Sequence, residues 1–168
     1  VLAEFPYEKG WSLYVGIPFC PSICLYCSFG SHPLDRWKKR VDEYLDALCR
    51  ELTFIQGQMK DRPLHTVYLG GGTPTTLTPE QMDRLLAHIG NTFDLSQVRE
   101  YTVEAGRPDT ITAGKLEVLG RYPVTRISVN PQTMNQKTLD LIGRKHTVED
   151  VEAIFRLCRD MGFDNINM

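Results

Sequence analysis

Apolar residues along the chain form short runs, separated by longer segments in which they recur every three or four positions. The runs lie at residues 12–17, 66–69, 101–105, 124–129 and 165–168, and their length is typical of buried strands. The spacing in the intervening segments places apolar side chains on one face of a helix. The pattern therefore predicts an α/β protein in which strands and helices alternate.

The segments between the strands also carry signals for where helices begin and end. Thr78, Thr112 and Thr147 each stand at an expected N-terminal cap, and Thr78 forms a capping-box pattern with Gln81. Gly162 stands where the last helix should stop. We expect helices at residues 35–58, from 79 onward, and at 113–120, 136–142 and 148–161.

Repeated strand–helix units with connections of this length predict a parallel sheet with right-handed crossovers. In such sheets the ligand site lies at the carboxyl ends of the strands. The segments with unusual composition, residues 18–27, 70–74, 104–108 and 130–132, each follow a predicted strand. We therefore expect all four segments to meet at one edge of the sheet.

The first of these segments contains three cysteines, Cys20, Cys24 and Cys27, in the spacing C-x3-C-x2-C. Three thiolates can hold three irons of a cubane iron–sulfur cluster and leave the fourth iron without a protein ligand. An open coordination position is typical of a metal centre that does chemistry. Pro18 and Pro21 flank Cys20 and favour a loop over a helix at this point.

Two other interpretations of the cysteine run stay open at this stage. His32 follows closely in the sequence and could complete a Cys3His zinc site. Positions i, i+4 and i+7 also share one face of a helix, so the cysteines could form a buried helical stripe.

Composition limits the classes of partner and compartment. The chain has 168 residues, enough for one domain with a core, and a net charge of −2, so we expect no nucleic-acid partner. We expect no membrane span, because no apolar stretch is long enough. Five cysteines, three of them in one motif, do not suggest a disulfide framework and favour a cytoplasmic location. The chain runs from Val1 to Met168, inside an apparent strand, and we expect it to be a fragment of a longer protein.

Polar residues after the later strands add candidate ligand contacts. Glu104 can accept hydrogen bonds from hydroxyl or ammonium groups, although it could instead pair with Arg107 or Arg126. Gln132 can both donate and accept, which suits a diol. Arg144 could form a bidentate contact with a carboxylate, although it could also be an ordinary solvated arginine.

The glycine run at residues 70–72 and the first strand supply the remaining candidates. Gly71, Gly72 and the adjacent Thr73 allow the backbone to approach a ligand closely, although the run could also be an ordinary turn. Tyr14 lies on the opposite strand face from its neighbours Leu13 and Val15. If those two pack under the helices, Tyr14 points inward, toward the cysteine site.

Together these motifs resemble those of the radical S-adenosylmethionine (SAM) superfamily. The chain is similar over nearly its whole length to the oxygen-independent coproporphyrinogen III oxidase family, and within it most like the branch called coproporphyrinogen dehydrogenase HemZ. The stretches that carry the resemblance are residues 14–20, 24–29, 70–75, 103–110, 126–132 and 141–144.

The resemblance implies a role for each candidate residue. Cys20, Cys24 and Cys27 would bind a [4Fe-4S] cluster, Tyr26 would lie near the adenine of SAM, and Tyr14 would face SAM and substrate in a catalytic position. The other implied contacts to SAM are Gly71, Gly72, Thr73, Glu104, Gln132 and Arg144. The glycines and threonine would hold the amino end of SAM, and the other three would contact its ribose and carboxylate.

The resemblance also implies a fold and a reaction. The fold would be a partial (β/α)6 TIM-like barrel, truncated after about the fifth strand, with residues 1–168 forming the radical SAM core. The reaction would convert propionates of coproporphyrinogen III to vinyl groups through a 5′-deoxyadenosyl radical. The implied partners are a porphyrinogen substrate and a reducing electron donor such as flavodoxin or ferredoxin.

Three positions depart from the better-understood members of the family. Phe29 replaces a further cysteine, Gly16 replaces a histidine, and residues 105–108 replace a more usual asparagine–proline form. These departures concern the substrate more than the cluster or SAM. A related haem-carrier branch shares the cluster and SAM motifs, so a haem-binding carrier without oxidase activity is the alternative. A zinc-stabilised α/β domain without redox function is a third hypothesis.

Overall fold

The computed structural model of the chain describes residues 9–30 and 32–168. Five strands form one sheet in the order β1-β4-β5-β6-β7, with every neighbouring pair parallel. The strands are β1 (Trp11–Ile17), β4 (Leu64–Gly71), β5 (Glu100–Glu104), β6 (Arg126–Ser128) and β7 (Ile166–Asn167). The alternation predicted from the sequence is confirmed, and strand order follows chain order as in the wall of a barrel.

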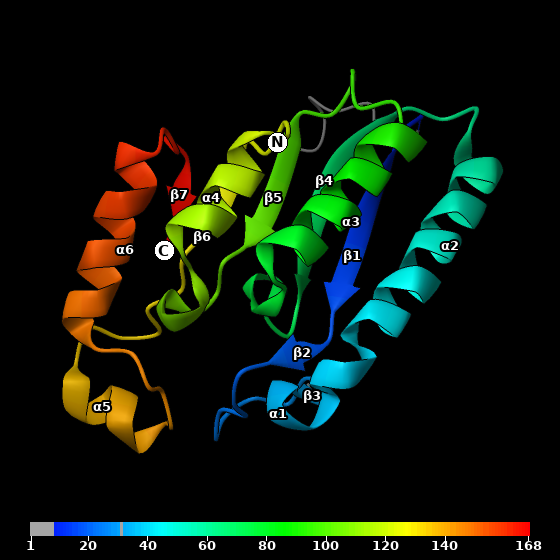
Figure 1. Cartoon of the computed structure of the whole chain (residues 1–168). Coiled ribbons are helices and arrows are strands. Elements are labelled where there is room, and N and C mark those ends of the chain that lie inside the picture. Colours follow the sequence, from blue (N-terminus) through cyan, green and yellow to red (C-terminus); the bar gives the residue numbers. More distant parts are fainter. Residues whose placement is uncertain (1–8, 31) are drawn as a thin grey trace.

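The helices follow the strands in the expected sequence. They are α1 (Leu34–Trp37), α2 (Val41–Met59), α3 (Pro79–Thr92), α4 (Ala113–Gly120), α5 (Gln136–Leu141) and α6 (Val148–Asp160). Helices α2, α3, α4 and α6 cover one face of the sheet, while α1 and α5 lie beyond the carboxyl ends of the strands (Figure 1). Three short 3-10 turns complete the chain: η2 (Lys38–Arg40), η3 (Pro74–Thr76) and η4 (Pro108–Thr110).

The caps predicted from the sequence are formed. The backbone N–H of Gln81 donates to Thr78 Oγ1 at 3.2 Å, and the backbone N–H of Thr78 donates to Gln81 Oε1 at 3.1 Å. Thr147 and Asp150 form a second capping box at the start of α6. Gly162, just after α6, has a φ of 88°, which is the left-handed conformation that ends a helix.

The expectation of one helix over residues 35–58 is wrong. The segment is divided into α1, the 3-10 turn η2 and α2, and the ring of Trp37 packs on that of His32 with centroids 4.8 Å apart. Trp37 and Val41 are still four residues apart, so the hydrophobic spacing continues across the break and does not reveal it. A second unexpected feature is the pairing of β2 (Phe19–Cys20) with β3 (His32–Pro33).

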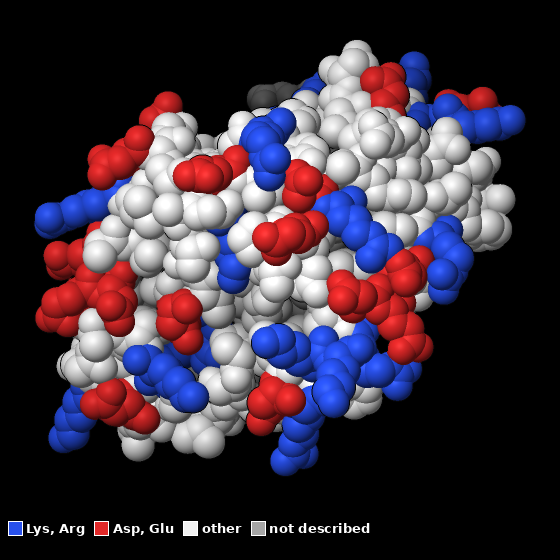
Figure 2. Space-filling model, viewed as in Figure 1, with Lys and Arg blue, Asp and Glu red and all other residues white. Residues whose placement is uncertain are grey.

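The core lies between the sheet and the helices that cover it. Leu13 and Val15 of β1, together with Val103 of β5 and Ile127 of β6, are buried there. The outer surface of the helices carries interspersed acidic and basic side chains (Figure 2). Some of these side chains pair between helices, as Arg84 does with Asp46. Within the described residues, no helix has the length and apolar character needed to cross a membrane.

Candidate functional site

The carboxyl ends of the strands enclose a cavity that collects almost all of the residues selected from the sequence. Tyr14 is the one candidate that does not line it. The candidates that do are Cys20, Cys24, Cys27, Tyr26, Gly71, Gly72, Thr73, Glu104, Gln132 and Arg144. The convergence predicted from strand topology is therefore present, although the fold alone does not assign a role to any one residue.

The three cysteines reach the cavity from β2 and the loop that follows it. Cys20 Sγ lies 3.5 Å from Thr73 Oγ1, and Cys24 Sγ accepts a hydrogen bond from Arg107 Nη2 at 3.4 Å. All three thiols are free, and the loop is irregular except for a turn in which the Cys27 amide donates to the Cys24 carbonyl at 3.1 Å. Three free thiols that share one cavity suit three corners of an iron–sulfur cluster.

The two alternative interpretations of the cysteines do not match this geometry. Cys24 and Cys27 lie outside any helix, so the helical stripe is wrong. The His32 ring packs on Trp37 and lines a different pocket, next to α2. The zinc interpretation therefore lacks its proposed fourth ligand.

The glycine run packs tightly against the segment that carries Cys20. Gly71 has a φ of 106°, in the left-handed region, and a Cβ on Gly72 would lie 2.8 Å from the Phe19 carbonyl oxygen and 3.0 Å from Cys20 Sγ. The Gly72 and Thr73 amides donate to carbonyls of residues 17 and 19 at 2.7 and 2.9 Å. The glycines are therefore required by the approach of β4 to the cysteine segment, and the run is not a free turn.

Glu104 is held by a tyrosine that the sequence analysis did not select. Tyr68 Oη donates to Glu104 Oε1 at 2.5 Å, and burial together with this bond raises the pKa of Tyr68 above its ordinary value. The expected arginine partners of Glu104 are engaged elsewhere: Arg126 pairs with Glu100, and Arg107 binds Ser22. The carboxylate of Glu104 therefore faces the cavity without a cationic side chain bound to it.

Tyr14 lies beside the cavity rather than in it. Its ring stacks on Tyr68 with centroids 5.8 Å apart and planes 11° from parallel, and its side chain is 62% exposed. It lines an adjoining pocket that shares Gly71, Gly72 and Phe29 with the cysteine cavity. Leu13 and Val15 are buried under the helices, so Tyr14 lies on the opposite face of the sheet as predicted, but its exposed side chain does not line the cysteine cavity.

Arg144 is not the solvated arginine that the sequence left possible. It is 8% exposed, and it donates to Tyr26 Oη at 2.7 Å and to the Gly106 carbonyl at 3.3 Å. Its Nε is buried without a hydrogen-bond partner. A buried guanidinium with an unsatisfied donor in a cavity wall is suited to an anionic ligand.

Gln132 enters the cavity wall from an unusual backbone conformation. Its φ is 67°, the only positive φ of a non-glycine residue in the described part of the chain. Asn130, which lies two residues earlier in the same loop, also lines the cavity, and its Oδ1 accepts a hydrogen bond from Ser128 Oγ at 2.9 Å. This loop follows β6, so the strand topology indicated its place even though Asn130 was not selected from the sequence.

Arg107 is another cavity residue that the sequence analysis did not select as a site residue, as are Phe29 and Gly106. Arg107 follows β5, is 2% exposed and binds Ser22 and Cys24 of residues 21–27, the loop after β2 that we call the cysteine loop. The topology placed its segment at the site, but nothing in the spacing of the residues distinguished Arg107 from a partner of Glu104.

Comparison with known proteins agrees with this geometry. The sequence model of the family described as the radical SAM superfamily matches residues 14–168, so the chain belongs to this superfamily. The resemblance to HemZ noted in the sequence is confirmed by a direct comparison of sequences. The chain is 46% identical over 160 residues to the oxygen-independent coproporphyrinogen-III oxidase-like protein HemZ of Bacillus subtilis, covering 94% of this chain and 32% of HemZ.

A differently named relative is also similar. The chain is 39% identical over 158 residues to the heme chaperone HemW of Bacillus subtilis, covering 94% of this chain and 41% of HemW. The chain thus spans between about a third and two fifths of the lengths of these relatives.

A solved structure confirms the fold. Coproporphyrinogen III oxidase (HemN) from Escherichia coli superposes with a TM-score of 0.83 at 29% identity, covering 94% of this chain and 36% of that one. The α/β fold expected from the sequence is therefore that of a radical SAM domain. Membership of the superfamily implies a [4Fe-4S] cluster and SAM, and the free thiols and the unsatisfied guanidinium nitrogen in the cavity fit such a pair of groups.

Proposed function

We propose that residues 1–168 form the radical SAM core of an enzyme that oxidatively decarboxylates the propionates of coproporphyrinogen III to vinyl groups. The observation that carries this proposal is the convergence of the cysteine triplet, the glycine run, Glu104, Gln132 and Arg144 on one cavity. The similarity to HemZ, which is named a coproporphyrinogen-III oxidase-like protein, supports the choice of substrate.

In this proposal Cys20, Cys24 and Cys27 hold a [4Fe-4S] cluster. When bound, the cluster and SAM supply a carbon-centred radical that can abstract hydrogen from an unactivated position. The thiols are suited to hold the cluster because they are free and Cys24 already accepts a hydrogen bond from a cation. The tight contact of Gly72 with Cys20 keeps this wall of the cavity close to the metal ligands.

The remaining cavity residues bind and orient SAM. Arg144 presents a buried guanidinium to a carboxylate, and Tyr26, held by Arg144 through a 2.7 Å hydrogen bond, offers its ring to the adenine. Glu104 accepts hydrogen bonds from the ribose or ammonium groups, with its carboxylate oriented by Tyr68. Gly71, Gly72 and Thr73 also line the cavity, where the carbonyl and hydroxyl oxygens of this segment can accept hydrogen bonds from the amino end.

The substrate side of the site is the adjoining pocket lined by Tyr14. This pocket is mainly apolar and shares Gly71, Gly72 and Phe29 with the cysteine cavity. The large, mainly apolar macrocycle of a porphyrinogen, with its pyrrole rings, suits an apolar wall with an aromatic ring. We therefore assign Tyr14 a position between SAM and substrate.

The reaction requires both a source and an acceptor of electrons. Reduction of the cluster requires a low-potential donor, for which a flavodoxin or a ferredoxin is suitable. The substrate radical left by hydrogen abstraction loses carbon dioxide and one electron to form each vinyl group, and a one-electron acceptor must take up that electron. The proposed location is the cytoplasm, where the five free cysteines of the chain would stay reduced.

A haem carrier related to HemW is the second candidate, because the chain is 39% identical to a protein named heme chaperone. The test is anaerobic incubation of the protein that carries this chain with coproporphyrinogen III, SAM, a chemical reductant and a one-electron acceptor, followed by mass analysis of the porphyrins. Loss of carbon dioxide from the substrate, absent in Cys24→Ala, supports the enzyme. Stoichiometric haem binding without turnover supports the carrier.

A further inference from the structure

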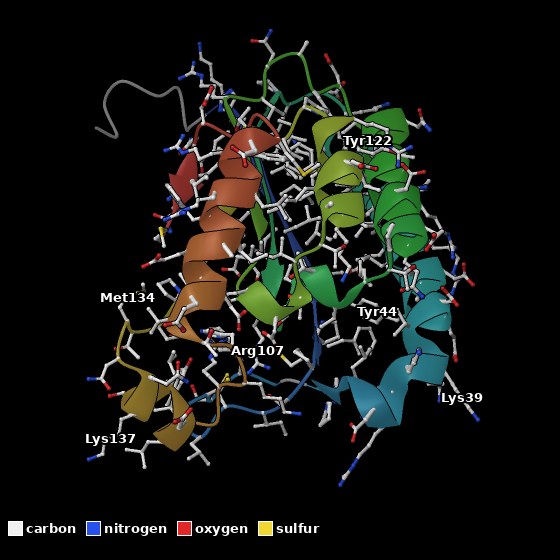
Figure 3. All side chains as sticks on the ribbon, turned by 60° about the vertical axis from the view of Figure 1, so that its left-hand side comes forward. Lys39, Tyr44, Arg107, Tyr122, Met134 and Lys137 are labelled. Carbon is white, nitrogen blue, oxygen red and sulfur yellow. The ribbon has the colours of Figure 1, made fainter. Side chains whose placement is uncertain are left out.

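Arg107 is a buried cation bound directly to the cysteine loop. It is 2% exposed, and it projects from the segment after β5 to the loop that follows β2 (Figure 3). Its Nη1 donates to Ser22 Oγ at 2.8 Å and to the Ser22 carbonyl at 3.1 Å, and its Nη2 donates to Cys24 Sγ at 3.4 Å. One guanidinium therefore contacts both the backbone of the loop and one of its thiols.

The charge of Arg107 has no acidic partner at the site. No carboxylate among the described residues forms an ion pair with it, and its Nε is buried without a hydrogen-bond partner. Its bonded neighbours are neutral serine oxygens and a sulfur atom. A buried cation of this kind requires a compensating negative charge, since an unpaired charge in the interior is strongly unfavourable.

We infer that Arg107 raises the reduction potential of the cluster that Cys20, Cys24 and Cys27 would hold, and this inference rests on the proposed function. Reduction adds one electron, taken from a low-potential flavin or iron–sulfur protein, so the charge of the cluster becomes more negative by one. Arg107 stabilises that added charge through its fixed positive charge and through its hydrogen bond to Cys24 Sγ. Hydrogen bonds to sulfur and local net charge are established determinants of cluster potentials.

The contacts with Ser22 give Arg107 a second, separable effect. They tie the loop between Cys20 and Cys24 to the end of β5, which fixes the distance between the guanidinium and the sulfur. Removing the Ser22 hydroxyl leaves the charge in place and removes one anchor. Removing the guanidinium removes charge and anchors together.

The test compares Arg107→Gln and Arg107→Met with the wild-type protein and with Arg121→Gln. Arg121 is an exposed arginine that pairs with Asp83 away from the cavity, so its variant controls for loss of one charge. Each protein is reconstituted anaerobically and titrated with reductant while the reduced-cluster signal is recorded. For the Arg107 variants, the equilibrium constant for reduction should fall by about tenfold, equal to ~59 mV for one electron.

Two further variants separate charge from anchoring. Arg107→Lys should lie closer to the wild-type potential than Arg107→Gln, because it retains the charge, and Ser22→Ala should change the potential less than either charge-removing variant. In the cluster-free protein, amide hydrogen exchange of residues 22–27 should quicken in both Arg107→Gln and Ser22→Ala. Unchanged exchange in both would overturn the anchoring role.

The redox role has its own contrary outcomes. Potentials of Arg107→Gln and Arg107→Met equal to that of the wild type would overturn it. Failure of both variants to hold iron would also overturn it, since Arg107 would then be needed for assembly alone. A wild-type protein that holds no iron would instead contradict the proposed function, so the two failures are distinguishable.

Discussion

The two faces of the sheet are built from the same strands but differ in almost every property. On the face under the helices, Val103 and Ile127 lie side by side on neighbouring strands, and both are fully buried. On the opposite face, Tyr14 pairs with Tyr68, and Glu104 pairs with Ser128. Because side chains alternate along a strand, one face provides packing and the other is free to carry chemistry.

The opposite face is organised by hydrogen bonds and ring stacking rather than by packing. Tyr14 stacks on Tyr68, which donates to Glu104, while Asn167 Nδ2 donates to Ser128 Oγ at 3.0 Å. These contacts join β1, β4 and β5 in one group and β6 and β7 in another, and the first group ends at Glu104 in the wall of the cysteine cavity. Stability and function in this chain should therefore respond to different substitutions, even at adjacent positions.

The strongest test of this difference uses two neighbouring residues of β5. Val103→Asp places a charge in the helix-covered core and should lower the free energy of unfolding by more than about 4 kcal/mol, enough to prevent folding. Glu104→Gln on the other face should change the free energy of unfolding by less than about 1 kcal/mol. Urea denaturation measures the free energy of unfolding of both variants. Similar losses of stability in the two variants would show that the faces are not distinct.

A smaller effect is expected where the two regions meet, at Gly72. In Gly72→Ala the new Cβ would lie 2.8 Å from a backbone oxygen, so the backbone must shift, at a cost of about 1–3 kcal/mol. Iron retention after reconstitution should fall as well, because Cys20 Sγ lies 3.0 Å from the same Cβ position.

Gly90 in α3 is the matched control, since a Cβ there would meet no atom within 4 Å. Gly90→Ala should stabilise the protein by roughly 0.5–1 kcal/mol through helix propensity. Thermal unfolding measures the stability of both variants, and iron analysis after reconstitution measures how much cluster each retains. Equal behaviour of the two would contradict the close approach of the glycine run to Cys20.

The tyrosine that holds Glu104 should affect ligand binding more than stability. Tyr68→Phe removes the 2.5 Å hydrogen bond to Glu104, and SAM should bind about tenfold more weakly because the carboxylate loses its orientation. Tyr122→Phe is the control, since Tyr122 Oη also donates to a carboxylate, that of Asp83, but away from the cavity. Equilibrium titration of the reconstituted proteins with SAM measures both affinities. Equally tight binding by the two variants would contradict the role of Tyr68 in orienting Glu104.

The smallest effect concerns pH. Burial lowers the pKa of His146 below its ordinary value of 6.5, with Arg144 and Arg107 adding to the decrease and Asp109 and the Pro131 carbonyl opposing it. At pH values near and below 6.5, the unfolded chain therefore binds more protons than the folded chain. The free energy of unfolding should fall as the pH is lowered from 7.5 to 5.5. His146→Leu should flatten this dependence in urea titrations at the two pH values, and an equally steep dependence would exclude His146 as its source.

The sequence predicted the fold well where periodicity and caps agreed. Strand alternation, the Thr78 and Thr147 caps and the parallel order all follow from local rules. The break before α2 could not be predicted, because Trp37 and Val41 keep helical spacing through a 3-10 turn. The pairing of β2 with β3 involves two residues from each strand, too few to form a recognisable pattern.

Position in the topology was enough to predict which residues lie at the site. It was not enough to predict which side chains pair with one another there. Ten candidates lie in one cavity because they follow parallel strands. Arg107 and Arg126 were equally plausible partners for Glu104 in the sequence, and the structure gives that place to Tyr68. Such choices depend on side-chain directions across neighbouring strands, which spacing along one chain does not contain.

Metal analysis of the anaerobically reconstituted protein, together with electron paramagnetic resonance spectra of the reduced protein recorded with and without SAM, tests the assignment of the three cysteines most directly. The account predicts about four irons per chain and a reduced-cluster signal that changes when SAM is added, because one iron of the cluster lacks a protein ligand. Zinc in place of iron, or a signal indifferent to SAM, would contradict the assignment of Cys20, Cys24 and Cys27 to a catalytic cluster.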